Sequence, residues 1–121
     1  MSEIAIETVY ITTSGAAGSA TGSGTTIPIL GFLLDVNLNF HGSAPATTDV
    51  TISDAVFGNI VVNTSSATDV WLAPRKATCD AAAAATGLYD LVPINGSLTI
   101  SVAQADALTN CLVATVRWLT P

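Results

Sequence analysis

The sequence predicts an all-β protein, a compact antiparallel β-sandwich or β-barrel of jelly-roll type. Apolar and polar residues alternate with a period of two along several segments, which is typical of strands with one buried face. These segments are short, and residues that favour turns separate them, as in sandwiches and barrels. The chain has 121 residues, which is enough for one domain with its own hydrophobic core.

The N-terminal region predicts a strand followed by a flexible connector. Residues 3–11 alternate and are rich in β-formers, whereas residues 14–26 are almost entirely Gly, Ser, Ala and Thr. We therefore divide the chain into an N-terminal strand with a Gly/Ser connector, residues 1–26, and a single β-domain, residues 27–121. We expect the strand to act as an arm that pairs with the sheet edge of a neighbouring subunit.

The β-domain begins with a strand from Ile27 to Phe40, in which apolar and polar residues alternate in the second half. Short strands follow at residues 50–53, 59–63 and 68–72. Residues 97–102 and 111–119 alternate in the same way, and we expect them to pair as a closing hairpin. Only the segment Asp80 to Gly87 predicts a helix, with Asp80 as its N-cap, five alanines, and Gly87 as its terminating residue.

Charge limits the classes of partner. The chain has nine acidic and three basic residues, a formal net charge of −6, and only 10% charged residues against about a quarter in an ordinary domain. Because nucleic-acid sites need clustered Lys and Arg, we expect no nucleic-acid partner. No apolar run is long enough for a membrane span, so we expect no membrane partner either. A largely neutral surface is suited to burial against other copies or another protein.

The N-terminus and the cysteines indicate where the protein is made. Its first residues lack the basic region and apolar core of a secretory signal, which predicts synthesis in the cytoplasm. In that reducing compartment Cys79 and Cys111 are expected to be thiols, with a single bridge as the less common alternative. Neither lies in a CxxC motif, so we predict no metal or redox site.

The sequence contains no convincing catalytic constellation. His41 is the only histidine, it lies beside a glycine in a predicted turn, and no GxSxG motif accompanies it. The Gly-rich stretch lacks the Lys-Ser/Thr ending of a phosphate-binding loop. The acidic residues are dispersed singly and are explained best as turn caps and solvated positions. We predict no catalytic residue, no cofactor and no metal.

The segment Trp71 to Lys76 is the strongest candidate for a contact point. A strand ends in Trp71, Pro74 stops its ladder, and Arg75 and Lys76 are two of the three bases. Trp and Arg are enriched at the energetic centres of interfaces. The alternative is that Trp71 fills the core and Arg75 pairs with an acid of its own chain. With the N-terminal arm added, the predicted interface residues are Ile4, Ile6, Tyr10, Trp71, Pro74, Arg75 and Lys76.

The same region carries a family resemblance. The order aromatic-Leu-Ala-Pro-Arg at residues 71–75, an Asp with a Gly-terminated loop at 80–87, the segment 89–103 and a final strand resembles small capsid decoration, or cement, proteins of tailed bacteriophages. The resemblance covers roughly Val50 onward, and the N-terminal part has no counterpart. It implies a trimer on the outer surface of a phage head that clamps neighbouring major capsid subunits.

Two other functional classes are compatible with a small all-β chain. A carbohydrate- or receptor-binding module of a phage fibre or tail would use Trp71, Tyr89 and Trp118 to stack on sugar rings. A small β-sandwich enzyme is disfavoured by the single histidine and the absence of metal-ligand motifs. The sequence therefore favours a structural virion protein, made in the host cytoplasm and located on the outer capsid surface, with the carbohydrate- or receptor-binding module as the alternative.

Overall fold

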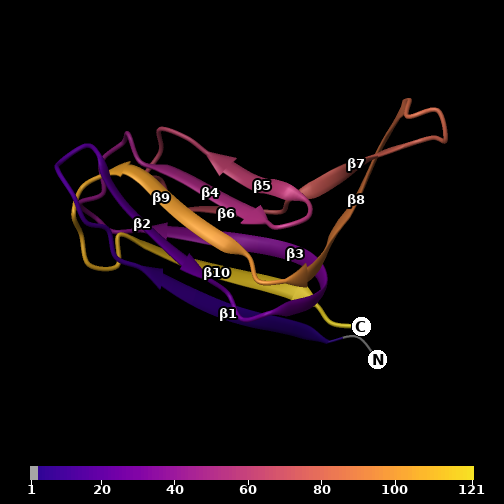
Figure 1. Cartoon of the computed structure of the whole chain (residues 1–121), viewed down its shortest axis with the longest axis horizontal. Helices are drawn as coiled ribbons and strands as arrows, with labels where there is room; N and C mark the ends of the chain where they lie inside the picture. Colours follow the sequence, from indigo (N-terminus) through magenta and orange to yellow (C-terminus); the bar gives the residue numbers. More distant parts are fainter. Residues whose placement is uncertain (1–2) are drawn as a thin grey trace.

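The computed structural model describes residues 3–121 and confirms the all-β prediction (Figure 1). Within this range there are ten strands and no helix, and the strands form two antiparallel sheets, as expected for a β-sandwich. The strands are β1 (Ile4–Ile11), β2 (Ala20–Thr25), β3 (Ile29–Phe40), β4 (Asp49–Asp54), β5 (Gly58–Asn63), β6 (Val70–Leu72), β7 (Arg75–Cys79), β8 (Ala85–Gly96), β9 (Thr99–Ala105) and β10 (Leu112–Leu119).

The strand order is that of a long hairpin rolled into a jelly roll. Working inward from both ends of the chain, β1 pairs with β10, β2 with β9, β3 with β8, and β4 with β5. Two further pairings, β10 with β3 and β9 with β4, fold this long hairpin into two sheets. The larger sheet has the order β1-β10-β3-β8-β7 with β6 also on β3, and the smaller has the order β2-β9-β4-β5.

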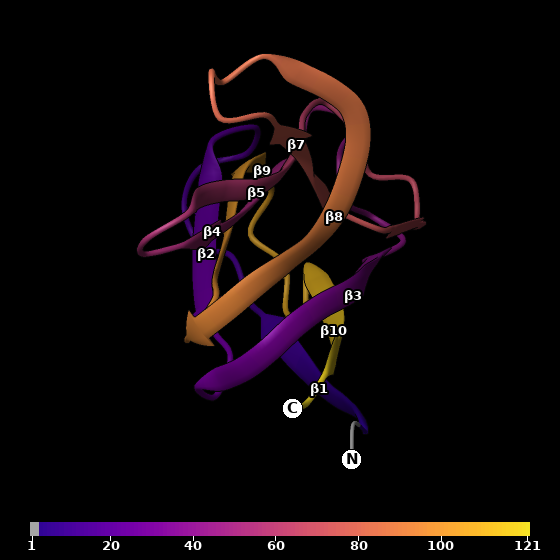
Figure 2. The same ribbon diagram turned by 90° about the vertical axis from the view of Figure 1, so that its right-hand side faces the viewer.

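One hairpin leaves the sandwich. Two strands pair with the same edge of β3: β8 pairs with residues 29–33, and β6 pairs with residues 36–38. Between these two pairings the chain forms a ribbon of β7 and the first half of β8, in which Arg75 lies opposite Leu91. Figures 1 and 2 show this ribbon extending away from both sheets. We call residues 75–91 the projecting hairpin.

The hydrophobic core lies between the two sheets. Strand β10 shows the pattern most clearly, since Leu112, Ala114 and Val116 are fully buried while the residues between them are half-buried. The smaller sheet contributes Ile52 and Ile100 from its central strands β4 and β9. The core consists almost entirely of aliphatic side chains, which accounts for the high hydrophobic content of the chain.

The predicted Gly/Ser connector is partly wrong, because residues 20–25 form β2. A Cβ on Gly22 would lie 2.5 Å from the carbonyl oxygen of Thr12, and one on Gly24 would lie 2.9 Å from the Val9 side chain. The strand lacks side chains at these positions because it passes so close to the end of β1. Read from the sequence alone, these glycines indicate a flexible segment, but in the structure they are required by close packing against β1.

The predicted helix over residues 80–87 is also wrong. Residues 80–84 form the turn of the projecting hairpin, and β8 begins at Ala85. Oδ1 of Asp80 accepts hydrogen bonds from the backbone N–H groups of Ala82 and Ala84 at 2.9 and 3.0 Å. A helix of one or two turns is marginal, and an Asp side chain that bonds to nearby backbone groups competes with it.

The last two strands do not form the expected hairpin. Strand β9 lies in the smaller sheet and β10 in the larger one, so residues 106–111 cross between the sheets. Strand β1 likewise pairs along its length with β10 of its own chain, from Ile4 opposite Leu119 to Ile11 opposite Leu112. It is therefore part of the sandwich in this structure, not a free arm. Local alternation identified these strands but not their partners.

Adding a methyl group at Gly22 tests the close approach of β2 and β1. The variant Gly22→Ala is expected to lower the free energy of unfolding by about 1–3 kcal/mol, because the backbone must shift to relieve the contact with Thr12. Gly42→Ala is the control, since nothing lies within 4 Å of a Cβ there, and it should be neutral or up to about 1 kcal/mol more stable. Urea denaturation measures both, and equal midpoints would contradict the packing explanation.

Candidate docking face and cleft

The outward side of the larger sheet is the first candidate site. In an antiparallel pair, residues directly opposite each other point to the same side of the sheet. The register of β1, β10, β3 and β6 therefore places one set of residues on a common outward surface. We call this surface the outer face; it comprises Ile4, Ile6, Thr8, Tyr10, Asp35, Asn37, Asn39, Trp71, Val113, Thr115, Arg117 and Leu119.

Strand β1 supplies the most exposed apolar part of the outer face. Ile4, Ile6 and Tyr10 are 62%, 63% and 63% exposed. These are the three residues that the sequence predicted for the arm, and the structure brings them together on one strand. Because β1 is at the edge of its sheet, no strand pairs with its second edge within residues 3–121, although β2 of the other sheet lies close to its C-terminal end.

Trp71 lies on the same face as these residues. A cross-strand row runs from Thr8 through Thr115 and Asn37 to Trp71, so Trp71 is three strand spacings, about 14 Å, from β1. Its side chain is 58% exposed. The alternative that Trp71 fills the core is therefore wrong, and the structure supports a surface position for this aromatic.

Arg117 is a functional candidate that the sequence analysis missed. Its Nε and an Nη donate to the two carboxylate oxygens of Asp35 at 2.7 and 2.5 Å, and its guanidinium carbon lies 5.3 Å from the centre of the Trp71 ring. Hydrogen bonding to Asp35 and the charge of that carboxylate raise the pKa of Arg117. Three strands bring these residues together, so only knowledge of their pairing would have revealed the cluster.

The other predicted contact residues hold the root of the projecting hairpin. Arg75 donates from Nη1 to the carbonyl oxygens of Leu34 and Pro74 at 2.9 and 2.8 Å, so the alternative pairing with an acid is not formed. Pro74 is half-buried beside β5 and β6, and Lys76 lies opposite Asp90 in the hairpin. These residues lie beside the outer face and do not extend it.

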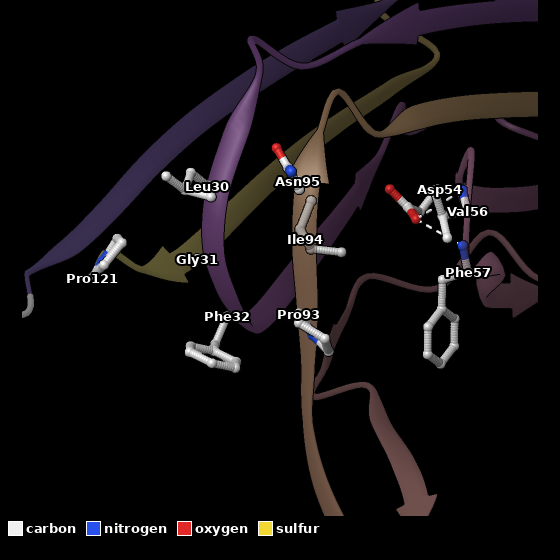
Figure 3. A pocket seen from close by; sticks show the side chains of 10 residues that line it. All are labelled: Leu30, Gly31, Phe32, Asp54, Val56, Phe57, Pro93, Ile94, Asn95 and Pro121. Carbon is white, nitrogen blue, oxygen red and sulfur yellow. Dashed lines mark hydrogen bonds between the residues drawn. The ribbon is translucent and has the colours of Figure 1, made fainter.

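A cleft at one end of the sandwich is the second candidate site. It has a volume of about 530 Å³ and lies between β3, β8 and the turn that joins β4 to β5. Figure 3 shows the Phe32 and Phe57 rings on either side of Pro93. Sequence reasoning missed it because its walls come from distant segments. The lining residues are Leu30, Gly31, Phe32, Asp54, Val56, Phe57, Pro93, Ile94, Asn95 and Pro121.

Asp54 is the charged group of the cleft. It is only 8% exposed, and its Oδ2 accepts hydrogen bonds from the backbone N–H groups of Val56 and Phe57 at 3.1 and 2.8 Å. Its Oδ1 forms no hydrogen bond within residues 3–121, and Figure 3 shows it turned toward Asn95. The cleft thus combines apolar walls with one unoccupied acceptor.

Most of the acidic side chains bond to backbone N–H groups, and several of these groups lie in turns, as the sequence predicts. Seven of the nine accept a backbone N–H hydrogen bond: Glu7, Asp49, Asp54, Asp69, Asp80, Asp90 and Asp106.

His41 lies in a turn and accepts from the Ser43 N–H through Nδ1 at 3.0 Å. Across residues 3–121 no three His, Cys, Asp or Glu side chains gather in a way that could hold a metal ion. The same part of the chain contains no helix that could cross a membrane.

Comparisons with known proteins give remote likenesses only. No family model and no curated protein matches the chain. A chain from the cryo-EM structure of the extra small virus VLP of the giant freshwater prawn Macrobrachium rosenbergii is 14% identical, with 96% of this chain and 78% of that chain covered and a TM-score of 0.33. The carbohydrate-binding module TmCBM61, solved with β-1,4-galactotriose, is 8% identical, with 98% and 86% covered and a TM-score of 0.36.

The two tryptophans differ in exposure, and quenching by acrylamide measures this difference. Trp71 is 58% exposed and Trp118 only 5%. We expect one accessible and one protected component in the native protein, and the accessible component should disappear in Trp71→Phe. If the emission of Trp71→Phe is still readily quenched in the folded state, the placement of these rings on opposite sides of the sheet is wrong.

The two cysteines are free thiols in the structure, and they differ in the same way. Cys79 is exposed in the projecting hairpin, and Cys111 is fully buried. Iodoacetamide is therefore expected to add one label to the native protein and two to the unfolded, unreduced protein, as counted by mass spectrometry. Loss of both labels under unfolding conditions would show a bridge.

Proposed function

We propose that this chain is a structural virion protein, a decoration or cement protein that clamps neighbouring major capsid subunits on the outer surface of a phage head. The observation that carries this proposal is the outer face, where Ile4, Ile6, Tyr10 and Trp71 are all more than half exposed on one side of a sheet. Exposed apolar side chains that gather on one face of a sheet, within a surface that is otherwise polar, are typical of a contact surface.

The charge distribution supports a protein partner for the outer face. Its charged groups, Asp35 and Arg117, neutralise each other in a bidentate pair, and the remaining polar groups are Thr and Asn side chains. A surface of this kind can be covered without stripping water from unpaired charges. The excess acidity lies elsewhere on the chain, and it suits a position on the outside of a shell whose interior faces DNA.

The free edge of β1 offers a second mode of contact with a shell subunit. An unpaired strand edge presents backbone N–H and C=O groups that an extended segment of a partner can use. The exposed Ile4, Ile6 and Tyr10 lie on this same strand. The edge and the face together therefore fit a clamp that contacts a subunit through backbone pairing and apolar burial.

A carbohydrate- or receptor-binding module is the second candidate function. The exposed rings of Trp71 and Tyr89 favour it, since aromatic faces stack on sugars. Trp118 does not contribute, because it is buried, and the guanidinium of Arg117 occupies one side of the Trp71 ring. Titration with a panel of neutral oligosaccharides should leave the emission of Trp71 unchanged if the structural role is correct.

A matched pair of surface variants tests the outer face. Ile6→Asn should weaken binding to undecorated heads of the phage that encodes the chain by about tenfold or more, as expected for the loss of a central apolar contact. Val62→Asn is the control, because Val62 is 62% exposed on edge strand β5 of the other sheet, against 63% for Ile6. Co-sedimentation with purified heads measures both.

The outcomes of this experiment separate the two candidate functions. Binding of the wild-type protein with a selective loss in Ile6→Asn supports the clamp. Equal losses in both variants would show that the outer face is not the contact surface. Failure of the wild-type protein to bind heads, together with a saccharide-dependent change in Trp71 emission, would replace the structural proposal with the carbohydrate-binding one.

A further inference from the structure

The projecting hairpin carries large apolar side chains that residues 3–121 leave mostly exposed. Leu88 and Tyr89 are 67% and 71% exposed, on a two-stranded ribbon that leaves the sandwich (Figure 1). An isolated two-stranded ribbon is at best marginally stable in water, and it gains stability by packing against something else. The shape and side chains of this hairpin therefore indicate a partner surface.

The ribbon also makes polar contacts of its own. The hydroxyls of Thr78 and Thr86 lie 2.5 Å apart across the strands, and Thr78 also donates to the carbonyl oxygen of Leu88 at 3.2 Å. Asp80 closes the turn through two backbone N–H groups. A hairpin fixed before contact loses little conformational entropy on docking, which favours its use as an inserting element.

The cleft has the complementary chemistry. The Phe32 and Phe57 rings are each 45% exposed on either side of Pro93, and Oδ1 of Asp54, in the wall of the cleft, accepts no hydrogen bond from residues 3–121. A tyrosine side chain matches both features, since its ring is apolar and its hydroxyl is a donor. A hydrogen bond from a hydroxyl to a carboxylate is among the stronger kinds in proteins.

The hairpin cannot fill the cleft of its own chain. Tyr89 precedes Pro93, which lines the cleft, by four residues on the same strand, a separation of about 13 Å in an extended backbone. Its ring is not among the groups that line the cleft. A tyrosine from the projecting hairpin could enter this cleft only from another molecule.

We propose that the projecting hairpin of a second copy of this chain docks in the cleft, with Tyr89 of that copy between Phe32 and Phe57 and its hydroxyl donating to Oδ1 of Asp54. The contact goes beyond the proposed function, because it joins copies to one another and leaves the outer face free for a shell. It is head-to-tail, so each copy offers one hairpin and one cleft, and a small ring such as a trimer satisfies every contact.

Charge favours the hairpin as the element that makes this contact. It contains two bases, Arg75 and Lys76, and two acids, Asp80 and Asp90, and is neutral overall. The sandwich therefore carries the whole net charge of −6. The neutral hairpin adds no like charge at the contact itself and, because it projects, it holds the two acidic sandwiches further apart than direct contact between them would.

Size-exclusion chromatography with light scattering tests the proposal on the full chain. The wild-type protein should be a multimer of the 12.2 kDa chain, and both Tyr89→Ala and Phe57→Asp should be monomers. Tyr89→Phe keeps the ring but loses the donor, so its dissociation constant should rise by about tenfold. Tyr10→Ala is the matched control, because Tyr10 is 63% exposed on the outer face, and it should assemble as the wild type does.

Mixing the two monomeric variants gives the sharper test. Tyr89→Ala keeps an intact cleft and Phe57→Asp keeps an intact hairpin, so an equimolar mixture should form a complex of about twice 12.2 kDa through one productive contact. Unchanged urea midpoints would confirm that both variants fold.

Other results would overturn the proposal. A monomeric wild-type protein, or a Tyr89→Ala variant with wild-type mass, would show that the hairpin does not join copies. Loss of assembly in Tyr10→Ala alone would assign self-association to the outer face. If Phe57→Asp keeps its wild-type mass but no longer binds heads, the cleft receives a segment of the shell subunit; this result would leave the proposed function standing while the inference fails.

Discussion

The pairing of β10 with both β1 and β3 is the interaction on which the rest of the structure depends. It joins the C-terminal strand to the N-terminal one and converts a long hairpin into two sheets. The inward residues of β10, such as Val116, fill the core, while outward residues, such as Arg117, organise the outer face. One strand thus determines both the stability of the sandwich and the composition of its exposed surface. A one-residue change in its register would exchange the two sets of side chains.

An irregularity in that same pairing shapes the cleft. The register of β10 against β3 shifts between Arg117 and Trp118, and a Cβ on Gly31 would collide with the Leu119 carbonyl oxygen. Gly31 has φ of +152°, a conformation that glycine adopts without strain. The close backbone approach at this bulge turns the end of β3 so that Phe32 stands beside the cleft. Gly31 thus lies both at the close approach to β10 and in the wall of the cleft.

The sequence predicts what is local and misses what depends on distant pairing. Alternation from Leu34 to Phe40 identifies a half-buried strand because the signal lies within the segment itself. Local composition gives the wrong prediction for β2, where glycines indicate a flexible connector but are required by the close approach of Thr12. It is also wrong for the alanine run, which indicates a helix, because the Asp80 side chain bonds to the backbone of a turn instead. For the site, local composition identified the exposed Trp71, but Arg117 and the cleft arise only when β3, β10 and the β4–β5 turn meet.

The acidity of the chain follows from its architecture. Ten strands without a helix, within residues 3–121, require many turns, and carboxylates satisfy turn N–H groups that no strand partner reaches. Asp35 is neutralised by Arg117 on the outer face, and the two bases and two acids of the projecting hairpin balance, so the net charge belongs to the rest of the sandwich. Turn chemistry thus accounts for part of the acidic balance. Among the turn carboxylates, Asp54 differs in combining near-complete burial with a position in the wall of an apolar cleft, while its Oδ2 caps the β4–β5 turn as the other carboxylates cap theirs.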